Sequence, residues 1–430
     1  MRDVKLLMVT PTYPHSANPM AGIFNQRSAE ALAAVCSHVE VLAPRPLVPL
    51  GLRNRNARWK SYSEIPRFER RNGINVHRPG YIQVPALGAA LWSARVAYAM
   101  SHRLARRLHA AASFDAILSF DLQGGGAIAW RLGRDLDLFT AGWATGGDVR
   151  VEHQQGAGRV VRRTLQELDL VFYQSSELLT VAAQLQGKTA AELDSRRNVV
   201  LPRGIPAPPP LEREACRAQW RSAWNVGERE VLVIYIGRIT RLKGAYELLA
   251  AAERTAASSP LMKYVVIGAR DGFDEGPEFS KRLSQITALN GKFLVLPACA
   301  PSEVWSYLCA ADIAAFPSHA EGMPNGLLEA LAMELPAVAF GIPALRDIDP
   351  RSEFLLSVPA LDAARFADAL ESLARSPEER RARGKLGRER VLSDFLIDRN
   401  MARAVDRIAE CRNSGSDSRW PAARQPGVLR

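Results

Sequence analysis

Residues 313–332 read IAAFPSHAEGMPNGLLEALA. The apolar run at the start, Ile313–Phe316, is typical of a buried strand, and the leucine and alanine residues from Leu327 onward favour a helix. Asn325 stands just before those residues, where we expect it to cap the helix N-terminus. The stretch therefore predicts a strand, a polar loop at its carboxyl end and a helix, the order that parallel α/β sheets repeat.

The start of this helix has the features of an anion-binding site. We expect the free backbone N–H groups of Gly326, Leu327 and Leu328 to point out of the helix N-terminus, where the helix dipole also favours negative charge. Glu321 in the loop and Glu329 about one turn inside the helix are suited to accept hydrogen bonds from the vicinal hydroxyls of a sugar. The alternative interpretation is that both glutamates are solvated residues flanking an ordinary loop.

A second loop with suitable charges follows the apolar run VLVIYI, residues 231–236. Gly237 allows a sharp turn, and Arg238 and Lys243 place two cations at the strand end, before a helix that starts near Ala245. A diphosphate requires fixed positive charge of this kind. On spacing alone, an exposed basic loop explains these residues equally well.

Charge and composition limit the classes of function. The chain has 430 residues, 56 of them basic and 45 acidic, and its net charge of +11 favours anionic partners. Its five cysteines lie far apart without a C-x-x-C pair, which argues against a metal ribbon or redox motif and fits the cytoplasm. No run of 18 apolar residues predicts a membrane-spanning helix, so any membrane contact is expected to be peripheral. No nucleic-acid recognition module is visible, so nucleic acid is not an expected partner.

Apolar runs alternate with helical stretches along most of the chain, which predicts an α/β fold with parallel sheets. The segment 202–210, PRGIPAPPP, contains five prolines and is the expected connector. We therefore expect two domains, 1–203 and 204–385. The pattern of 386–412 predicts a C-terminal helix, and the Ser-, Pro- and Arg-rich segment 413–430 predicts a disordered tail.

Taken together, the two loops resemble the donor site of the retaining glycosyltransferases of family 4. The matching features are Gly-Arg-x4-Lys-Gly at 237–244 and, about 80 residues later, Glu-x7-Glu at 321–329. Earlier in the chain, Ala21–Phe24 resembles the N-terminal glycine loop of that family, and Gly146-Gly147-Asp148 its later Gly-x-Asp. The resemblance implies the GT-B fold, two Rossmann-like doubly wound domains facing each other across a cleft, with the helix 386–412 crossing back to the first domain.

The family also implies a reaction, the transfer of a sugar from a UDP- or GDP-sugar with retention at the anomeric carbon. Arg238 and Lys243 would neutralise the diphosphate, Glu329 would hold the ribose hydroxyls, and Glu321 would contact the transferred sugar. The expected donor-binding residues are Gly22, Gly237, Arg238, Lys243, Glu321, Gly322, Asn325, Gly326, Leu327 and Glu329. The expected catalytic residues are Glu321, Arg238, Lys243 and Asp148.

Three positions depart from the family pattern. Thr145 stands where a histidine is common, Arg203-Gly204 replaces an Asn-Gly pair, and Leu345 takes the place of an acid in a late glycine loop. We still expect activity because the donor loops are intact. The alternatives are a non-catalytic or divergent sugar-nucleotide-binding protein of this fold, or an epimerase of the same fold.

No metal or cofactor beyond the donor is expected. The Asp-x-Asp sequences at 135–137 and 347–349 match the metal motif of the other glycosyltransferase fold, and we interpret both matches as chance. The expected acceptor is a glycan or lipid-linked molecule of cell-surface polysaccharide or glycolipid biosynthesis. The segment 91–112 has a basic and apolar pattern, with Arg95, Arg103, Arg106 and Arg107. It either docks on the anionic inner face of the cytoplasmic membrane or simply covers the sheet as an ordinary helix.

Overall fold

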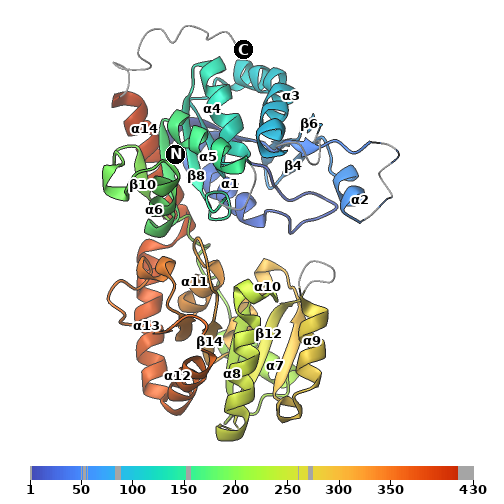
Figure 1. Ribbon diagram of the computed structural model, residues 1–430, viewed down its shortest axis with the longest axis vertical. Coiled ribbons are helices and arrows are strands. Elements are labelled where there is room, and N and C mark those ends of the chain that lie inside the picture. The colour runs from blue at the N-terminus through green and yellow to red at the C-terminus, as the bar shows by residue number, and fades with distance from the viewer. Residues whose placement is uncertain are drawn as a thin grey trace. The chain divides into compact units, whose positions relative to one another are not determined.

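The computed structural model describes residues 2–49, 51, 55, 57–82, 89–151, 156–259, 261–269 and 275–414. The chain forms two compact units. The first comprises Met1–Pro202 and Asp398–Arg430, and the second comprises Arg203–Ile397. Each unit contains a largely parallel sheet flanked by helices (Figure 1), which confirms the predicted α/β class.

Within the described residues, the sheet of the first unit has eight strands in the order β10-β9-β8-β7-β1-β2-β5-β4. Only β4 runs antiparallel to its neighbour, β5. The run from β7 to β9 is buried throughout because helices cover it, as expected for parallel strands. The strands are β1 (Arg2–Val9), β2 (Cys36–Leu42), β4 (Phe68–Arg71), β5 (Ile74–His77), β7 (Ala116–Phe120), β8 (Phe139–Ala144), β9 (Leu170–Tyr173) and β10 (Asn198–Val200), with β3 (Arg45–Pro46) and β6 (Gly80–Tyr81) forming a separate pair.

Helix α3 packs against α4 and α5, and α6 packs against α5, so these helices form a continuous layer (Figure 1). The helices of this unit are α1 (Ile23–Val35), α2 (Ala57–Ser63), α3 (Ala89–Ala112), α4 (Gly125–Leu136), α5 (Ala157–Glu167), α6 (Ser176–Leu185) and α14 (Ile397–Ser414). Arg2 in β1 forms an ion pair with Asp406, and Asp115, just before β7, forms one with Arg412. These two ion pairs attach α14 to the sheet of the first unit.

The C-terminal region differs from its prediction in one respect. The expected single helix 386–412 is divided, because α13 (Pro377–Asp394) ends before Phe395 and α14 begins at Ile397. Residues 413 and 414 continue α14, and the rest of the predicted tail lies outside the described residues.

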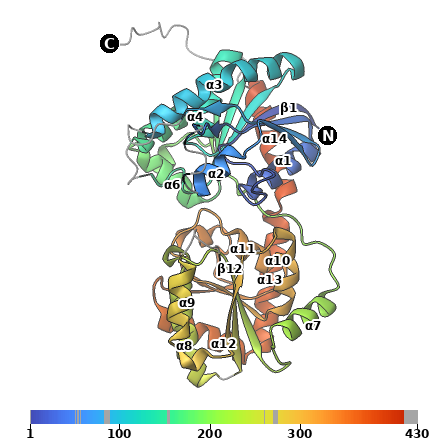
Figure 2. The same cartoon turned by 90° about the vertical axis from the view of Figure 1, so that its right-hand side faces the viewer.

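The described sheet of the second unit has six strands, all parallel, in the order β13-β12-β11-β14-β15-β16. They are β11 (Val231–Ile236), β12 (Met262–Ala269), β13 (Phe293–Pro297), β14 (Ile313–Phe316), β15 (Ala337–Phe340) and β16 (Leu355–Val358). Helix α8 packs against α12, α7 against α10 and α11 against α13 (Figure 2). The helices are α7 (Arg213–Ala223), α8 (Ala245–Ser258), α9 (Gly276–Ser284), α10 (Pro301–Ala310), α11 (Asn325–Ala332), α12 (Ala363–Arg375) and α13.

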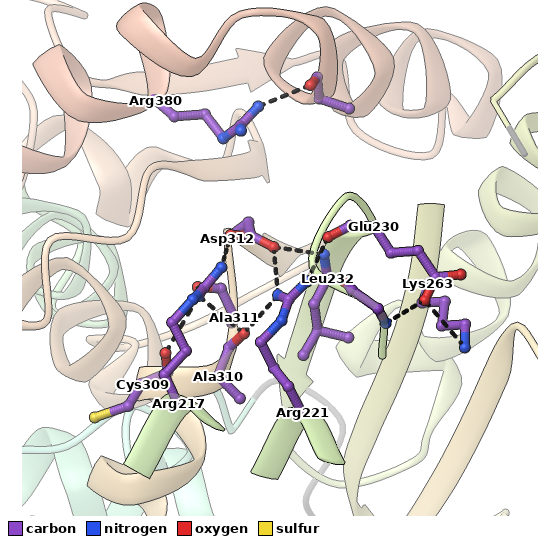
Figure 3. Close-up of polar contacts among 12 residues, drawn as sticks. Arg217, Arg221, Glu230, Leu232, Lys263, Cys309, Ala310, Ala311, Asp312 and Arg380 are labelled. Carbon is purple, nitrogen blue, oxygen red and sulfur yellow. Dashed lines mark hydrogen bonds and ion pairs between the residues drawn. The ribbon is translucent and has the colours of Figure 1, made fainter. Parts of the chain in front are cut away.

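A polar cluster secures the amino ends of β11 and β14 (Figure 3). Asp312, just before β14, accepts hydrogen bonds from Arg217 at 2.6 Å, from Arg221 at 3.0 Å and from the backbone N–H of Leu232 at 2.8 Å. Arg221 is buried and also donates to the carbonyl oxygens of Gly227 and Glu230. Because both arginines belong to α7, this cluster fixes that helix to the edge of the sheet opposite the predicted binding loops.

The predicted connector is packed against the second unit. Gly204 has a φ of 83°, and a Cβ atom there would lie 2.3 Å from the carbonyl oxygen of Phe395. Ile205 donates to that same oxygen at 2.8 Å and forms a bridge with Leu396. A side chain at position 204 would therefore disturb this contact, which explains a glycine after Arg203.

Candidate active site

The two predicted loops lie side by side because they follow neighbouring strands. β11 pairs directly with β14, and in a parallel sheet the carboxyl ends of such strands share one edge. A Cβ atom on Gly326 would lie 3.2 Å from the carbonyl oxygen of Ile236, the last residue of β11. The N-terminus of α11 therefore packs beside the Gly237-Arg238 turn, as the sequence predicted.

Two glycines allow the backbones around this edge to approach closely. A Cβ on Gly244, which has a φ of 72°, would lie 1.8 Å from the carbonyl oxygen of Pro317, just after β14. A Cβ on Gly268 near the end of β12 would lie 2.1 Å from the carbonyl oxygen of Gly237. These contacts fix the loop 237–244 between its two neighbours.

An ion pair joins the same loops. Lys243 Nζ lies 2.6 Å from Glu321 Oε1, and 21% of the lysine side chain and 11% of the glutamate side chain are exposed. The backbone N–H of His319 also donates to the carbonyl oxygen of Leu242 at 3.0 Å. Lys243 and Glu321, which are 78 residues apart in the chain, therefore belong to one site.

Arg238 is exposed, and its backbone is held by the Tyr235 hydroxyl, which donates to the Arg238 carbonyl oxygen at 2.7 Å. The guanidinium thus extends from a fixed turn at the end of β11. An exposed guanidinium on a fixed backbone is well suited to contact a phosphate group.

The helix N-terminus differs from its prediction by one residue. Pro324 occupies the N-cap position, and Asn325 is the first residue of α11. The N–H groups of Leu327 and Leu328 both donate to the Pro324 carbonyl oxygen at 3.1 Å. The prediction that these two groups are free for a ligand is therefore wrong. Asn325 and Gly326, which precede the first intrahelical donor, instead present the N–H groups of the first turn.

Glu329 is buried in α11, with 6% of the residue exposed. Burial and the nearby carboxylates of Glu303 and Glu329 raise the pKa of the Cys299 thiol to about 11. Glu329 therefore lies near the segment that follows β13, whereas Glu321 lies near Lys243. The two acidic residues occupy different parts of the same edge of the sheet.

The predicted residues of the first unit have structural roles in their loops. Gly22 has a φ of 70° at the N-cap of α1, and a Cβ there would lie 2.8 Å from the Thr12 carbonyl oxygen. Asp148 accepts backbone hydrogen bonds from Leu122 at 2.9 Å, Thr145 at 2.9 Å and Gly146 at 2.7 Å. Both of its carboxylate oxygens are used in these bonds, which hold the surrounding loops in place, and its expected catalytic role stays a prediction.

Asp121, which had no predicted role, lies beside Asp148 at the same edge of the first sheet. It follows β7 directly, has a φ of 133° and is 8% exposed. Its Oδ1 accepts hydrogen bonds from the N–H groups of Gly124 at 2.6 Å and Gly125 at 3.0 Å. Its buried Oδ2 has no hydrogen-bond partner within the described part of the chain. The signal in the sequence was an acidic residue between the strand AILSF and a glycine run.

The environment of Asp121 opposes its negative charge. Burial, and next the charge of Asp148, raise the pKa of Asp121 to about 7. A buried carboxyl with a strained backbone and one unpaired oxygen is a candidate for contact with a ligand.

The second Asp-x-Asp match has a structural explanation. Asp349 is buried and accepts backbone hydrogen bonds from Glu353 and Phe354 at 2.9 Å and from Leu355 at 2.7 Å. The carboxylate therefore fixes the turn before β16.

Comparisons with known proteins agree with this arrangement. Residues 217–390 match the family model described as Glycosyl transferases group 1. TuaC of Bacillus subtilis, named as a teichuronic acid biosynthesis glycosyltransferase, is 28% identical over 379 residues, which cover 85% of this chain and 88% of TuaC. A D-inositol 3-phosphate glycosyltransferase of Geodermatophilus obscurus is 32% identical over 230 residues, half of each chain.

Solved structures show the same fold at low sequence identity. Sucrose-phosphate synthase from Thermosynechococcus elongatus has a TM-score of 0.72 and 19% identity, covering 95% of this chain and all of that one. Anabaena HepE in complex with UDP has a TM-score of 0.69 and 16% identity, covering 95% of this chain and all of HepE. The predicted GT-B fold is therefore confirmed.

Proposed function

We propose that the chain acts as a group 1 glycosyltransferase of the GT-B fold and transfers a sugar from a UDP- or GDP-sugar to a glycan or lipid-linked acceptor, with retention at the anomeric carbon. One observation carries the donor assignment. Arg238, the Lys243–Glu321 pair and the N-terminus of α11 meet at one edge of one sheet.

In this proposal the diphosphate lies between the side-chain cations and the first turn of α11. Lys243 is held near its working position by Glu321 before a donor binds, and Arg238 moves onto the phosphates from its fixed turn. The N–H groups of Asn325 and Gly326 bind a phosphate oxygen, with support from the helix dipole. Glu329 accepts hydrogen bonds from the ribose hydroxyls.

The residues of this chain then act mainly by positioning and by stabilising the leaving group. The bond between the anomeric carbon and the phosphate oxygen breaks while the acceptor hydroxyl forms a bond on the same face of the sugar. The hydroxyl proton passes to the departing phosphate oxygen. Arg238 and Lys243 supply the positive charge that this phosphate needs, and we therefore propose a metal-independent reaction.

The first unit supplies the acceptor side of the proposal. The unpaired Oδ2 of Asp121 accepts a hydrogen bond from an acceptor hydroxyl, and Asp148 holds the loops on either side. Two similar proteins support the general assignment. HepE has been solved with UDP-glucose, and TuaC is named for teichuronic acid biosynthesis.

We also propose that the enzyme works at the inner face of the cytoplasmic membrane. No helix in the described ranges is long and apolar enough to cross a bilayer. Helix α3, however, exposes Arg103, Arg106 and Arg107, together with the 48% exposed Met100. A basic surface with an apolar residue suits peripheral contact with anionic lipid.

The proposal is tested by incubating the purified protein with UDP-, GDP- and ADP-sugars and lipid-linked acceptors in EDTA. We expect glycosylated product, whose anomeric configuration NMR shows to match that of the donor. Inversion would contradict the retaining mechanism, and abolition by EDTA would contradict metal independence. Donor binding without turnover would indicate a non-catalytic protein, and a changed sugar without transfer would indicate an epimerase.

A further inference from the structure

A basic pocket lies between helices α3, α4 and α5 of the first unit, whereas the donor loops belong to the second unit. Its volume is about 410 Å³. Arg95 comes from α3, Trp130 and Arg131 from α4, and Arg159, Val160 and Arg163 from α5. Each of these helices packs against the other two, so the pocket is formed by three fixed elements.

The pocket has more positive charge than its described surroundings neutralise. Arg163 forms an ion pair with Glu167 on α5, but no described carboxylate pairs with Arg95, Arg131 or Arg159. Arg131 donates instead to the backbone carbonyl of Ala127. The arginines therefore leave several guanidinium donors for another molecule.

The surroundings of Arg131 in the pocket oppose its positive charge. Burial, and next the charge of Arg95, lower the pKa of Arg131 to about 10. The Arg131 guanidinium also lies 4.1 Å from the ring centre of Trp130, which holds it in place by a cation–π contact. An anion bound here would relieve the repulsion between like charges.

Trp130 contributes a further donor. Its indole N–H is buried and has no acceptor in the described part of the chain. A buried polar atom without a partner normally costs free energy, so a rearrangement around Trp130 that gave this N–H an acceptor would be favourable.

We propose that this pocket binds a phosphate or pyrophosphate group. Guanidinium groups bind phosphate oxygens in a bidentate manner, and several of them on rigid helices form a specific site. The volume exceeds that of a phosphate alone, so the group is carried by a larger molecule, either a soluble phosphorylated compound or a lipid headgroup.

The pocket lies close to the acceptor side of the first unit. Arg131 is six residues beyond Gly125, the first residue of α4, and this corresponds to about 9 Å along the helix. The start of α4 in turn contacts Asp121 through Gly124 and Gly125. A phosphate on the acceptor could therefore occupy the pocket while a sugar hydroxyl reaches Asp121, an extension that rests on the proposed function.

Direct binding tests the pocket without relying on turnover. Inorganic pyrophosphate is titrated calorimetrically into Arg238→Ala/Lys243→Ala, which lacks the donor-site cations. Adding Arg95→Ala/Arg159→Ala, which alters two exposed pocket residues, should weaken binding at least about 10-fold. The matched control Arg67→Ala/Arg70→Ala removes the same charge from exposed positions of the same unit and should change binding by less than about twofold.

A vesicle experiment distinguishes the two sources of the phosphate. Phosphatidylcholine vesicles contain either phosphatidic acid or phosphatidylglycerol at equal charge. A preference for phosphatidic acid that is lost only in Arg95→Ala/Arg159→Ala indicates a lipid headgroup, and pyrophosphate binding without this preference indicates a soluble ligand. The proposal is overturned if neither probe binds, or if the pocket and control variants behave alike. A failed transferase assay would not affect either measurement.

Discussion

The Lys243 ammonium lies 2.6 Å from Glu321 Oε1, joining the loop after β11 to the loop after β14. The pair forms at the sheet edge where the N-terminus of α11 also lies. Both side chains are mostly buried, so each holds the other in the position that a donor would meet. Removing one partner therefore removes a ligand contact and also leaves the other partner unpaired.

We expect Lys243→Ala and Glu321→Gln each to lower the transfer rate by about 100-fold or more, because both disturb charge at the leaving group or the sugar. Initial rates with a nucleotide sugar would measure the loss. The double variant should lose less than the product of the two single effects, because the residues act as a unit. The exposed Lys281→Ala on α9 is the control, and full activity in both single variants would refute the donor-site assignment.

Glu329 gives a different prediction because it is proposed to bind the nucleoside. Glu329→Gln should raise the KM for the donor by about 10- to 100-fold, as expected for losing a hydrogen bond to a charged group. The Kd of free UDP or GDP should rise equally, since the ribose is present in both. Glu303→Gln, near the same Cys299 thiol, is the matched control. Unchanged nucleotide affinity in Glu329→Gln would contradict this role.

The raised pKa of Asp121 predicts a pH-dependent stability. The carboxyl has a pKa of about 7 in the folded chain and about 4 in the unfolded chain. Between these values the folded state holds a proton that the unfolded state has released, so the free energy of unfolding falls as the pH rises from about 4 to about 7. Asp121→Asn removes this penalty and should gain stability relative to wild type at pH 8, on the order of 1–4 kcal/mol.

Urea unfolding of both proteins at pH 5 and pH 8 measures this effect. The exposed Asp3→Asn is the control, which should leave the pH dependence as it is. If the difference between Asp121→Asn and wild type is the same at both pH values, Asp121 does not titrate in this range.

Gly244 tests whether the close approach of the two loops is required. Gly244→Ala combines an unfavourable φ of 72° with a Cβ placed 1.8 Å from the Pro317 carbonyl oxygen. Gly291→Ala is a matched control, since its φ is 70° and its Cβ would meet nothing within 4 Å. The control should lose about 1–2 kcal/mol of unfolding free energy, the cost of the left-handed backbone alone. Gly244→Ala should lose more and should also weaken donor binding, whereas equal losses would show that the contact is not important.

The sequence alone predicted the features that depend on residues close together in the chain. The strand, loop and helix around Glu321 and the turn at Arg238 each follow from short apolar runs and glycine positions, and their neighbouring strands bring them together. Two details depended on exact backbone geometry. Pro324 replaced Asn325 as the N-cap, and the break between α13 and α14 had no proline or glycine to mark it.

The features that the sequence did not predict depend on contacts between residues far apart in the chain. Asp121 and Asp148 are 27 positions apart, and only the pairing of β7 with β8 places their loops together. The basic pocket requires arginines from three helices, so no local motif reveals it. The role of Asp148 likewise depends on which backbone N–H groups fold around its carboxylate.

The basic face of α3 provides the last prediction. An arginine near an anionic membrane contributes about 1 kcal/mol to binding, so Arg103→Ala/Arg106→Ala/Arg107→Ala should reduce partitioning onto phosphatidylglycerol vesicles by about 100-fold. Vesicle sedimentation at low and high salt measures the change, and salt should weaken wild-type binding because it screens exposed charge. The control Arg67→Ala/Arg70→Ala/Lys188→Ala removes three exposed cations elsewhere in the same unit and should bind nearly as wild type. If both triple variants lose binding equally, the interaction reflects net charge, and α3 is an ordinary helix that covers the sheet.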